Sequence, residues 1–367
     1  MPLVLLLALV TQCAEQRAPS PQWTIDPAPE LTIGGDPSDT AAIFTEVAGA
    51  TRLPDGHILV GDRGDFALRL FDQEGRLGRR FGRDGDGPGE IRYLKALLRC
   101  GDSLVTIDVG DDRTSIFSID GAYVRAFRFG SPQPGVPPYL TACNRNLLFV
   151  HHGWEDWRQR KLGVYRMPVP YWISGADSAV RHVIGSFPGS ERYGTVGGAG
   201  PLPLGKQPAV AIASDRIYIG TADRYEILVF DLSGSPRDTI RKSAVNLQTK
   251  PADIEAFKER EIAAEGERRR AAIERRYADF PFPETVPAYA NFVVDADENL
   301  WVQDYPRGQA TTVTWTVFDR TGGQVAEIAL PTDLTVFEIG HDYVLGRWLS
   351  VEEAIPQVRM YRLRRSG

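Results

Sequence analysis

The chain has 367 residues, of which 43% are hydrophobic and 25% charged, and its formal net charge is −6. These values are ordinary for a globular protein with one large or two medium domains. The acidic balance argues against a nucleic-acid-binding protein, because phosphate recognition needs a basic surface. Three cysteines are too few for a disulfide scaffold or a metal cluster.

The chain starts with a short apolar run, Leu3 to Val10, followed by Cys13 and a polar linker up to residue 22. Such a run is too short to span a bilayer but is typical of the centre of a signal peptide. Residues 1–22 resemble a bacterial lipoprotein leader in which Cys13 is acylated, although Gln12 stands where a small residue is normal. We expect an exported periplasmic or cell-envelope protein. A buried N-terminal strand is the alternative.

Polar turns recur between β-rich runs from residue 23 to the C-terminus. Their first residues are 46, 43, 70, 83 and 43 positions apart, and they stand at Asp55-Gly56, Gly101-Asp102, Asn144-Arg145, Ser214-Asp215, Asp297-Glu298 and Gly340-His341. The two long intervals contain insertions, so the unit is about 43 residues and occurs six times. Four short strands in each unit predict an all-β, six-bladed β-propeller over residues 23–367.

The two ends of the chain are expected to complete one blade together. The last repeat stops one strand short, whereas Glu30 to Gly34 form a lone strand before the first repeat. We predict that this N-terminal strand becomes the outer strand of the last blade, which removes free strand edges.

The stretch "GRDGDGPGE", residues 82–90, raises the question of a phosphate-binding loop. Such a loop requires a following helix and a Lys with Ser or Thr at its end, and neither is present. We interpret the segment as the crossing between two blades, where Gly82, Gly85, Gly87 and Gly89 permit sharp turns.

Three segments carry a resemblance to a known family: "FGRDGDGPGEI" at 81–91, "FPFPETVPAYANFVVDADENLWVQDYPRG" at 280–308 and "VFEIGHDYVLGRWL" at 336–349. With them, the chain from about Trp23 onward resembles the NHL-like six-bladed propellers, a group of mostly exported bacterial proteins. The resemblance implies the fold and little about activity.

Cys100 and Cys143 occupy matching positions in neighbouring repeats. An exported protein can oxidise such a pair, but the sequence does not show whether the two Cα atoms approach closely enough. We expect two buried free thiols, with a disulfide as the alternative.

The loops between the second and third strands of each blade, and those entering the next inner strand, are expected to meet at one mouth of the channel, here called the loop face. Ligand-binding candidates on this face are Arg63, Asp65, His151, His152, Trp154, Arg158, Tyr289, Tyr305 and Arg307. Aromatic rings and arginines suit stacking and anion contacts. The adjacent histidines point to opposite faces of a strand and are poor partners for one metal ion. A loop folded over its own blade is the alternative.

The aspartates Asp62, Asp108 and Asp304 end the second strand in three repeats. Because they recur, we interpret them as caps that accept backbone N–H groups rather than as catalytic residues.

Residues 249–279 form the one clearly helical stretch, inserted between blades four and five, and Gly266 is expected to break it into two helices. Its apolar stripe is thin, which suits a surface helix. Two roles of this insertion are possible from the sequence: a lid over the loop face, or a solvent-exposed addition without a role in binding.

Two functions follow from these features. The favoured one is a membrane-tethered, monomeric propeller that binds a protein, peptide or glycan at the loop face, with no cofactor and no catalysis. The alternative is a metal-dependent hydrolase, resembling propeller lactonases, or a lyase, with calcium on the axis held by Glu46 and Asn291.

Overall fold

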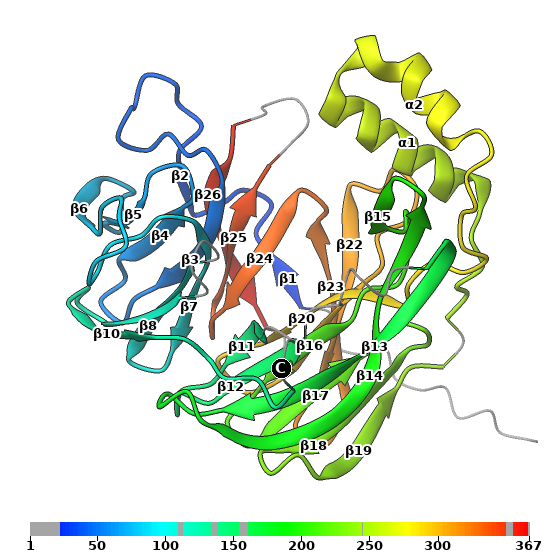
Figure 1. Cartoon of the computed structure of the whole chain (residues 1–367). Helices are drawn as coiled ribbons and strands as arrows, with labels where there is room; N and C mark the ends of the chain where they lie inside the picture. The colour runs from blue at the N-terminus through cyan, green and yellow to red at the C-terminus, as the bar shows by residue number, and fades with distance from the viewer. Residues whose placement is uncertain are drawn as a thin grey trace, which may run out of the picture.

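The structure is a computed structural model that describes residues 23–108, 113–133, 138–153, 161–243, 245–349 and 355–365. β-strands dominate these residues, and they pair into six antiparallel sheets (Figure 1). The fold is therefore all-β and propeller-like, as the repeat predicts. Among the residues described here, no helix is long and apolar enough to cross a membrane.

Four of the sheets contain four consecutive strands each. The first sheet holds β3 (Val47–Arg52), β4 (Ile58–Asp62), β5 (Ala67–Phe71) and β6 (Leu77–Phe81). The second holds β7 (Leu94–Cys100), β8 (Ser103–Asp108), β9 (Arg113–Ser118) and β10 (Tyr123–Phe127). The fourth holds β16 (Ala209–Ile212), β17 (Arg216–Gly220), β18 (Glu226–Asp231) and β19 (Pro236–Arg241), and the fifth β20 (Tyr289–Val294), β21 (Leu300–Asp304), β22 (Thr312–Phe318) and β23 (Gln324–Pro331).

The third sheet contains the first long insertion of the repeat. Its strands are β11 (Pro138–Cys143), β12 (Phe149–Gly153), β13 (Gly163–Ser174), β14 (Val180–Thr195) and β15 (Gly198–Pro201). β13 and β14 have 12 and 16 residues, so they form a hairpin much longer than the others. This extension explains the 70-residue interval between turns in the sequence.

The sixth sheet combines both ends of the described chain. β24 (Leu334–Ile339), β25 (Tyr343–Trp348) and β26 (Gln357–Arg364) come from the C-terminal region, and β1 (Thr24–Ile25) and β2 (Leu31–Ile33) both pair with β26. The sequence predicted one strand here, from Glu30 to Gly34. The structure has a shorter strand at that place and a second one before it.

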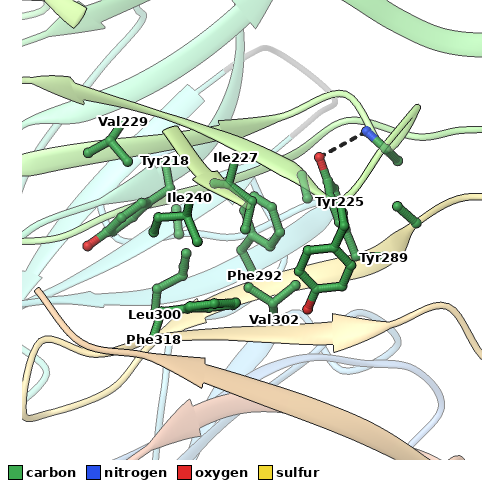
Figure 2. Close-up of a cluster of buried hydrophobic side chains, with 14 of the residues drawn as sticks. Tyr218, Tyr225, Ile227, Val229, Ile240, Tyr289, Phe292, Leu300, Val302 and Phe318 are labelled. Carbon is green, nitrogen blue, oxygen red and sulfur yellow. Dashed lines mark hydrogen bonds between the residues drawn. The ribbon is translucent and has the colours of Figure 1, made fainter. Parts of the chain in front are cut away.

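The first strands of the six sheets lie next to one another, in the order β3, β7, β11, β16, β20, β24 and back to β3. Large apolar side chains fill the space between neighbouring sheets. Figure 2 shows the cluster between the fourth and fifth sheets, where Tyr218 and Ile227 pack with Phe292 and Val302. Burial of this kind is the main force that holds one sheet on the next.

The second long interval of the repeat contains a helical hairpin, as predicted. It consists of α1 (Pro251–Glu265), the short 3-10 turn η2 (Glu267–Arg269) and α2 (Arg270–Tyr277), between β19 and β20. Gly266 ends α1 with a φ of 91°, a conformation that glycine adopts without strain. In Figure 1 the two helices project beyond the ends of the strands.

The glycine-rich segment joins β6 to β7, as expected for a crossing between two sheets. Gly82, Gly85 and Gly89 have positive φ values, whereas Gly87 does not. The carboxylate of Glu90 accepts a hydrogen bond from the backbone N–H of Gly87 at 2.7 Å. The loop is thus held by its own side chains.

The expectation of two free thiols is wrong. Cys100 at the end of β7 and Cys143 at the end of β11 form a disulfide, with their Cα atoms 5.7 Å apart. Because these inner strands lie side by side, equivalent positions in neighbouring repeats are brought within bonding distance.

Candidate functional site

A cavity of about 1080 Å³ lies among the inner strands β3, β7, β11, β16, β20 and β24, and every one of them contributes to its wall. Turns between first and second strands add Gly101, Asp102, Arg145, Ser214 and His341. The cavity therefore extends toward this end of the inner strands, here called the turn end. Its volume is in the range of small-molecule sites in proteins.

The cavity runs along the inner strands, from residues near their loop-face ends, such as Pro208 and Ala290, to the turn end. The inner strands begin at the loop face and end at the turns that line the cavity. Sequence reasoning placed the binding candidates on the loop face, so most of them do not contribute to this wall. Asn291, which was predicted only as an alternative calcium ligand, does line the cavity, from β20.

Arg63, Asp65 and Glu46 are engaged in ion pairs within the first sheet. Arg63 Nη1 lies 2.8 Å from Glu46 Oε1, and its Nε donates a hydrogen bond to the carbonyl of Leu94 at 3.1 Å. The Asp65 carboxylate forms an ion pair with Arg69, whose Nε lies 3.1 Å away, and accepts a hydrogen bond from Arg80 Nη2 at 2.6 Å. These contacts order the loop after β4.

His151 and His152 contact different neighbours, as expected for adjacent residues on a strand. His151 is fully buried, 4.3 Å from the ring of Phe129 and 5.5 Å from that of Trp172, and burial lowers its pKa to about 3. His152 stacks on Tyr139 at 4.7 Å, and burial lowers its pKa as well. Trp154 and Arg158 lie outside the described residues.

The remaining loop-face candidates belong to the fifth sheet or the loop after β21, and they are Tyr289, Tyr305 and Arg307. The buried Tyr289 hydroxyl donates to the carbonyl of Glu226 at 2.9 Å and accepts from the backbone N–H of Ala222 at 3.0 Å. Burial raises the pKa of the half-buried Tyr305. Arg307 binds Asp253 in the first turn of α1 and therefore joins the helical hairpin to the sheet.

The calcium alternative needs Glu46 and Asn291 to converge. Asn291 lines the cavity, whereas the Glu46 carboxylate binds Arg63 and is not part of the described cavity wall. Within the described ranges, no group of three or more His, Cys, Asp or Glu side chains is placed to hold a metal ion. Glu46 and Asn291 therefore do not line the described cavity together.

The recurring aspartates divide into two kinds. Asp62 accepts the backbone N–H of Glu46 at 2.7 Å, and Asp108 accepts that of Arg92 at 2.7 Å, as predicted for caps. Asp304 instead accepts the hydroxyl of Tyr225 at 3.1 Å and lies 3.6 Å from Lys242 Nζ. Burial raises the pKa of Asp304, against the opposing effect of Lys242.

Glu338 is the central acidic group of the cavity wall. Its carboxylate accepts hydrogen bonds from the hydroxyls of Thr51 and Tyr343. Burial raises the pKa of Glu338, and these two hydrogen bonds oppose the shift. The ring of Tyr343 fits here because residue 340 is glycine, since a Cβ at that position would lie 2.0 Å from the ring.

Two arginines lie beside Glu338. The Arg52 guanidinium covers the Tyr343 ring at 4.9 Å, and its Nη1 is 3.9 Å from Asp342. Arg99 donates to the carbonyls of Gly101 at 3.1 Å and Arg52 at 2.9 Å. Fixed guanidinium groups of this kind are suited to binding carboxylate or phosphate.

Sequence reasoning missed Arg52, Arg99 and Tyr343. A signal was available, since Arg52 and Arg99 both stand just before the first turn of consecutive repeats, in "TRLPDG" and "LRCGD". These residues stand at the turn end, whereas the predicted contacts were on the loop face, where propeller sites are common.

No family model matches the chain, and no curated protein matches its sequence. Solved structures with a similar fold do exist. One is a protein of Bacteroides fragilis described as exported, with 12% sequence identity, a TM-score of 0.50 and coverage of 94% of this chain and 95% of that one. Another is a member of the DUF4221 family from Bacteroides vulgatus, with 10% identity, a TM-score of 0.54 and coverage of 95% and 100%. At these identities the likeness shows the fold alone.

Proposed function

We propose that this protein is an exported, NHL-like six-bladed propeller that binds a protein, peptide or glycan through its axial cavity, without chemistry of its own. The continuous contacts from β3 around to β24, and the pairing of β1 and β2 with β26, support six blades and a ring closed by the N-terminal strands. A closed ring needs no partner to fold, which supports a monomer.

Export is supported by two independent features. The sequence of residues 1–22 resembles a leader, with Cys13 as the site of a lipid anchor. The Cys100–Cys143 disulfide is of the kind that persists in oxidising compartments such as the periplasm.

The cavity carries the proposal of binding. It is lined by all six inner strands, is large enough for the end of a peptide or a glycan, and contains hydroxyl, amide and guanidinium groups that suit a polar ligand. We do not propose the calcium-dependent hydrolase, because the Glu46 carboxylate binds Arg63 and does not line the cavity beside Asn291.

The test is a binding screen of the purified chain on peptide and glycan arrays, followed by affinity measurements with one substitution that fills the cavity. Ala290 lines the cavity and is exposed, so Ala290→Trp adds bulk there with little cost to packing. Val183→Trp, at an exposed position on β14, is the matched control.

The proposal expects a ligand whose affinity falls at least about tenfold in Ala290→Trp and stays unchanged in Val183→Trp. It is contradicted if the arrays retain nothing, or if Ala290→Trp leaves the affinity of the retained ligand unchanged. In the second case the ligand binds elsewhere on the surface.

A further inference from the structure

Arg52 stands out among the cavity residues because its guanidinium has no hydrogen-bond acceptor within the part of the chain that the structure describes. Its Nε is buried and has no partner, and the nearest carboxylate, that of Asp342, lies 3.9 Å from Nη1, beyond hydrogen-bonding distance. The Arg52 side chain is 33% exposed and lines the cavity, so its terminal nitrogens are left to donate to a ligand there.

Arg99 adds a second positive charge on the neighbouring inner strand. Two of its nitrogens donate to backbone carbonyls, which hold the guanidinium in place without neutralising its charge. One of these carbonyls belongs to Arg52, so the two arginines are directly coupled. Together they present a pre-oriented pair of cations to the cavity.

The acidic groups nearby leave much of this charge uncompensated. The Glu338 carboxyl is held by the neutral hydroxyls of Thr51 and Tyr343, and burial disfavours its ionised form. Asp342 has 64% of its side chain exposed, and Asp102 is exposed as well, so solvent screens both.

The other two carboxylates of the wall have partners of their own. The fully buried Asp295 accepts from Trp301 Nε1 at 2.8 Å and pairs with Arg365 at 3.1 Å. Glu298 accepts the backbone N–H of Ser214 at 2.7 Å. Among the described residues, the ion-pair partners of these two carboxylates are Arg365 and Arg145, so the charges of Arg52 and Arg99 remain available.

We propose that Arg52 and Arg99 form a subsite for an anionic group of the ligand, a carboxylate or a phosphate. This inference rests on the proposed function, because it assigns a chemistry to one wall of the same cavity. The bound oxygens accept from the terminal nitrogens of Arg52, whose side chain is 33% exposed, and from the remaining terminal donors of Arg99. The stacking of Arg52 on Tyr343 keeps its plane in position for such a bidentate contact.

The test measures binding of small anions to the whole purified chain by isothermal titration calorimetry at constant ionic strength. The probes are succinate, inorganic phosphate and dimethyl succinate, which has the succinate skeleton without charge. The variants are Arg52→Gln, Arg99→Gln and Arg52→Lys. Arg181→Gln, at an exposed position on β14, is the control.

The proposal expects one of the two anions to bind and the neutral ester not to. Affinity falls about tenfold or more in Arg52→Gln and in Arg99→Gln, and less in Arg52→Lys, which keeps the charge but loses the bidentate contact. The control keeps its affinity. Binding of succinate indicates a carboxylate ligand, and binding of inorganic phosphate indicates a phosphate ligand. Melting temperatures without anion show whether each variant is folded.

The proposal is overturned if no anion binds, if the ester binds as well as succinate, or if Arg52→Gln and the control behave alike. Failure here is distinguishable from failure of the proposed function. A ligand from the arrays that is lost in Ala290→Trp but not in Arg52→Gln leaves the cavity as the binding site and removes only the anion subsite.

Discussion

Ile33 and Val358 lie directly opposite each other on the paired strands β2 and β26, although 325 positions separate them in the chain. Ile33 is 1% exposed and packs in one cluster with Leu345 and Met360. The N-terminal region of the propeller is thus held by apolar contacts with the C-terminal strands.

Replacing Ile33 with alanine tests how much this junction contributes to stability. We expect Ile33→Ala to lower the free energy of unfolding by about 2 to 4 kcal/mol, because it removes buried methylene groups and leaves a cavity. Urea denaturation measures the change. Thr32→Ala, at an exposed position on the same strand, is the control, and equal losses in both variants would contradict a buried junction.

Arg307 is expected to keep the helical hairpin attached to the fifth sheet. Its guanidinium binds Asp253 and donates to the carbonyls of Asn246 at 2.8 Å and Gln248 at 2.6 Å. Arg307→Met leaves a buried carboxylate with fewer donors. Hydrogen–deuterium exchange should show faster exchange in residues 251–277, with the sheets unchanged. Protection equal to that of the wild type would show that other contacts, such as the packing of Phe280 on Tyr193, hold the hairpin.

The disulfide should stabilise the inner strands β7 and β11. Closing a loop between positions 43 apart stabilises a chain by about 4 kcal/mol in the chain-entropy model, and measured values are typically about 2 to 4 kcal/mol. We expect this loss in the Cys100→Ser, Cys143→Ser double variant, measured by denaturation. A reducing agent should bring the wild type to the same midpoint and leave the variant unaffected. If the reducing agent also lowers the midpoint of the double variant, the loss of stability does not come from the Cys100–Cys143 disulfide.

His151 predicts a specific loss of stability in acid. Its folded pKa of about 3 lies below the ordinary 6.5, so the unfolded chain binds the proton more tightly. Stability is therefore full above pH 6.5 and falls as the pH drops toward 3. Between pH 7.5 and 4.5, the wild type should lose about 2 to 3 kcal/mol more than His151→Phe. The exposed His182→Gln serves as control, and a slope equal to the wild type in His151→Phe would refute the prediction.

Gly220 provides space for Tyr289 in the cluster of Figure 2. A Cβ at residue 220 would lie 2.3 Å from the Tyr289 hydroxyl oxygen, which bridges Ala222 and Glu226. We expect Gly220→Ala to cost about 1 to 3 kcal/mol through overpacking. Gly78→Ala is the comparison, because its nearest contact would be an ordinary 3.6 Å. Thermal unfolding measures both variants, and equal losses of stability in Gly220→Ala and Gly78→Ala would argue against a steric clash with Tyr289.

Much of the fold was predictable because its signals are local. The turn Asp55-Gly56 and its equivalents mark strand ends, and Gly266 marks the end of a helix. The caps Asp62 and Asp108 were also interpreted correctly, since a short acidic side chain after a strand has few other uses. Asp304 occupies the same position in the repeat, but its partners Tyr225 and Lys242 come from the neighbouring sheet and could not be read from one repeat.

The order of strands and turns is encoded residue by residue, because backbone preferences of glycine and alternation of apolar side chains act over short distances. The disulfide and the cavity depend instead on how the sheets lie against one another. Cys100 meets Cys143, and Arg52 meets Arg99, because equivalent positions of adjacent inner strands face the same space. Spacing along the chain reveals that these positions are equivalent. Their distance and their partners arise from packing between sheets, which no single segment specifies.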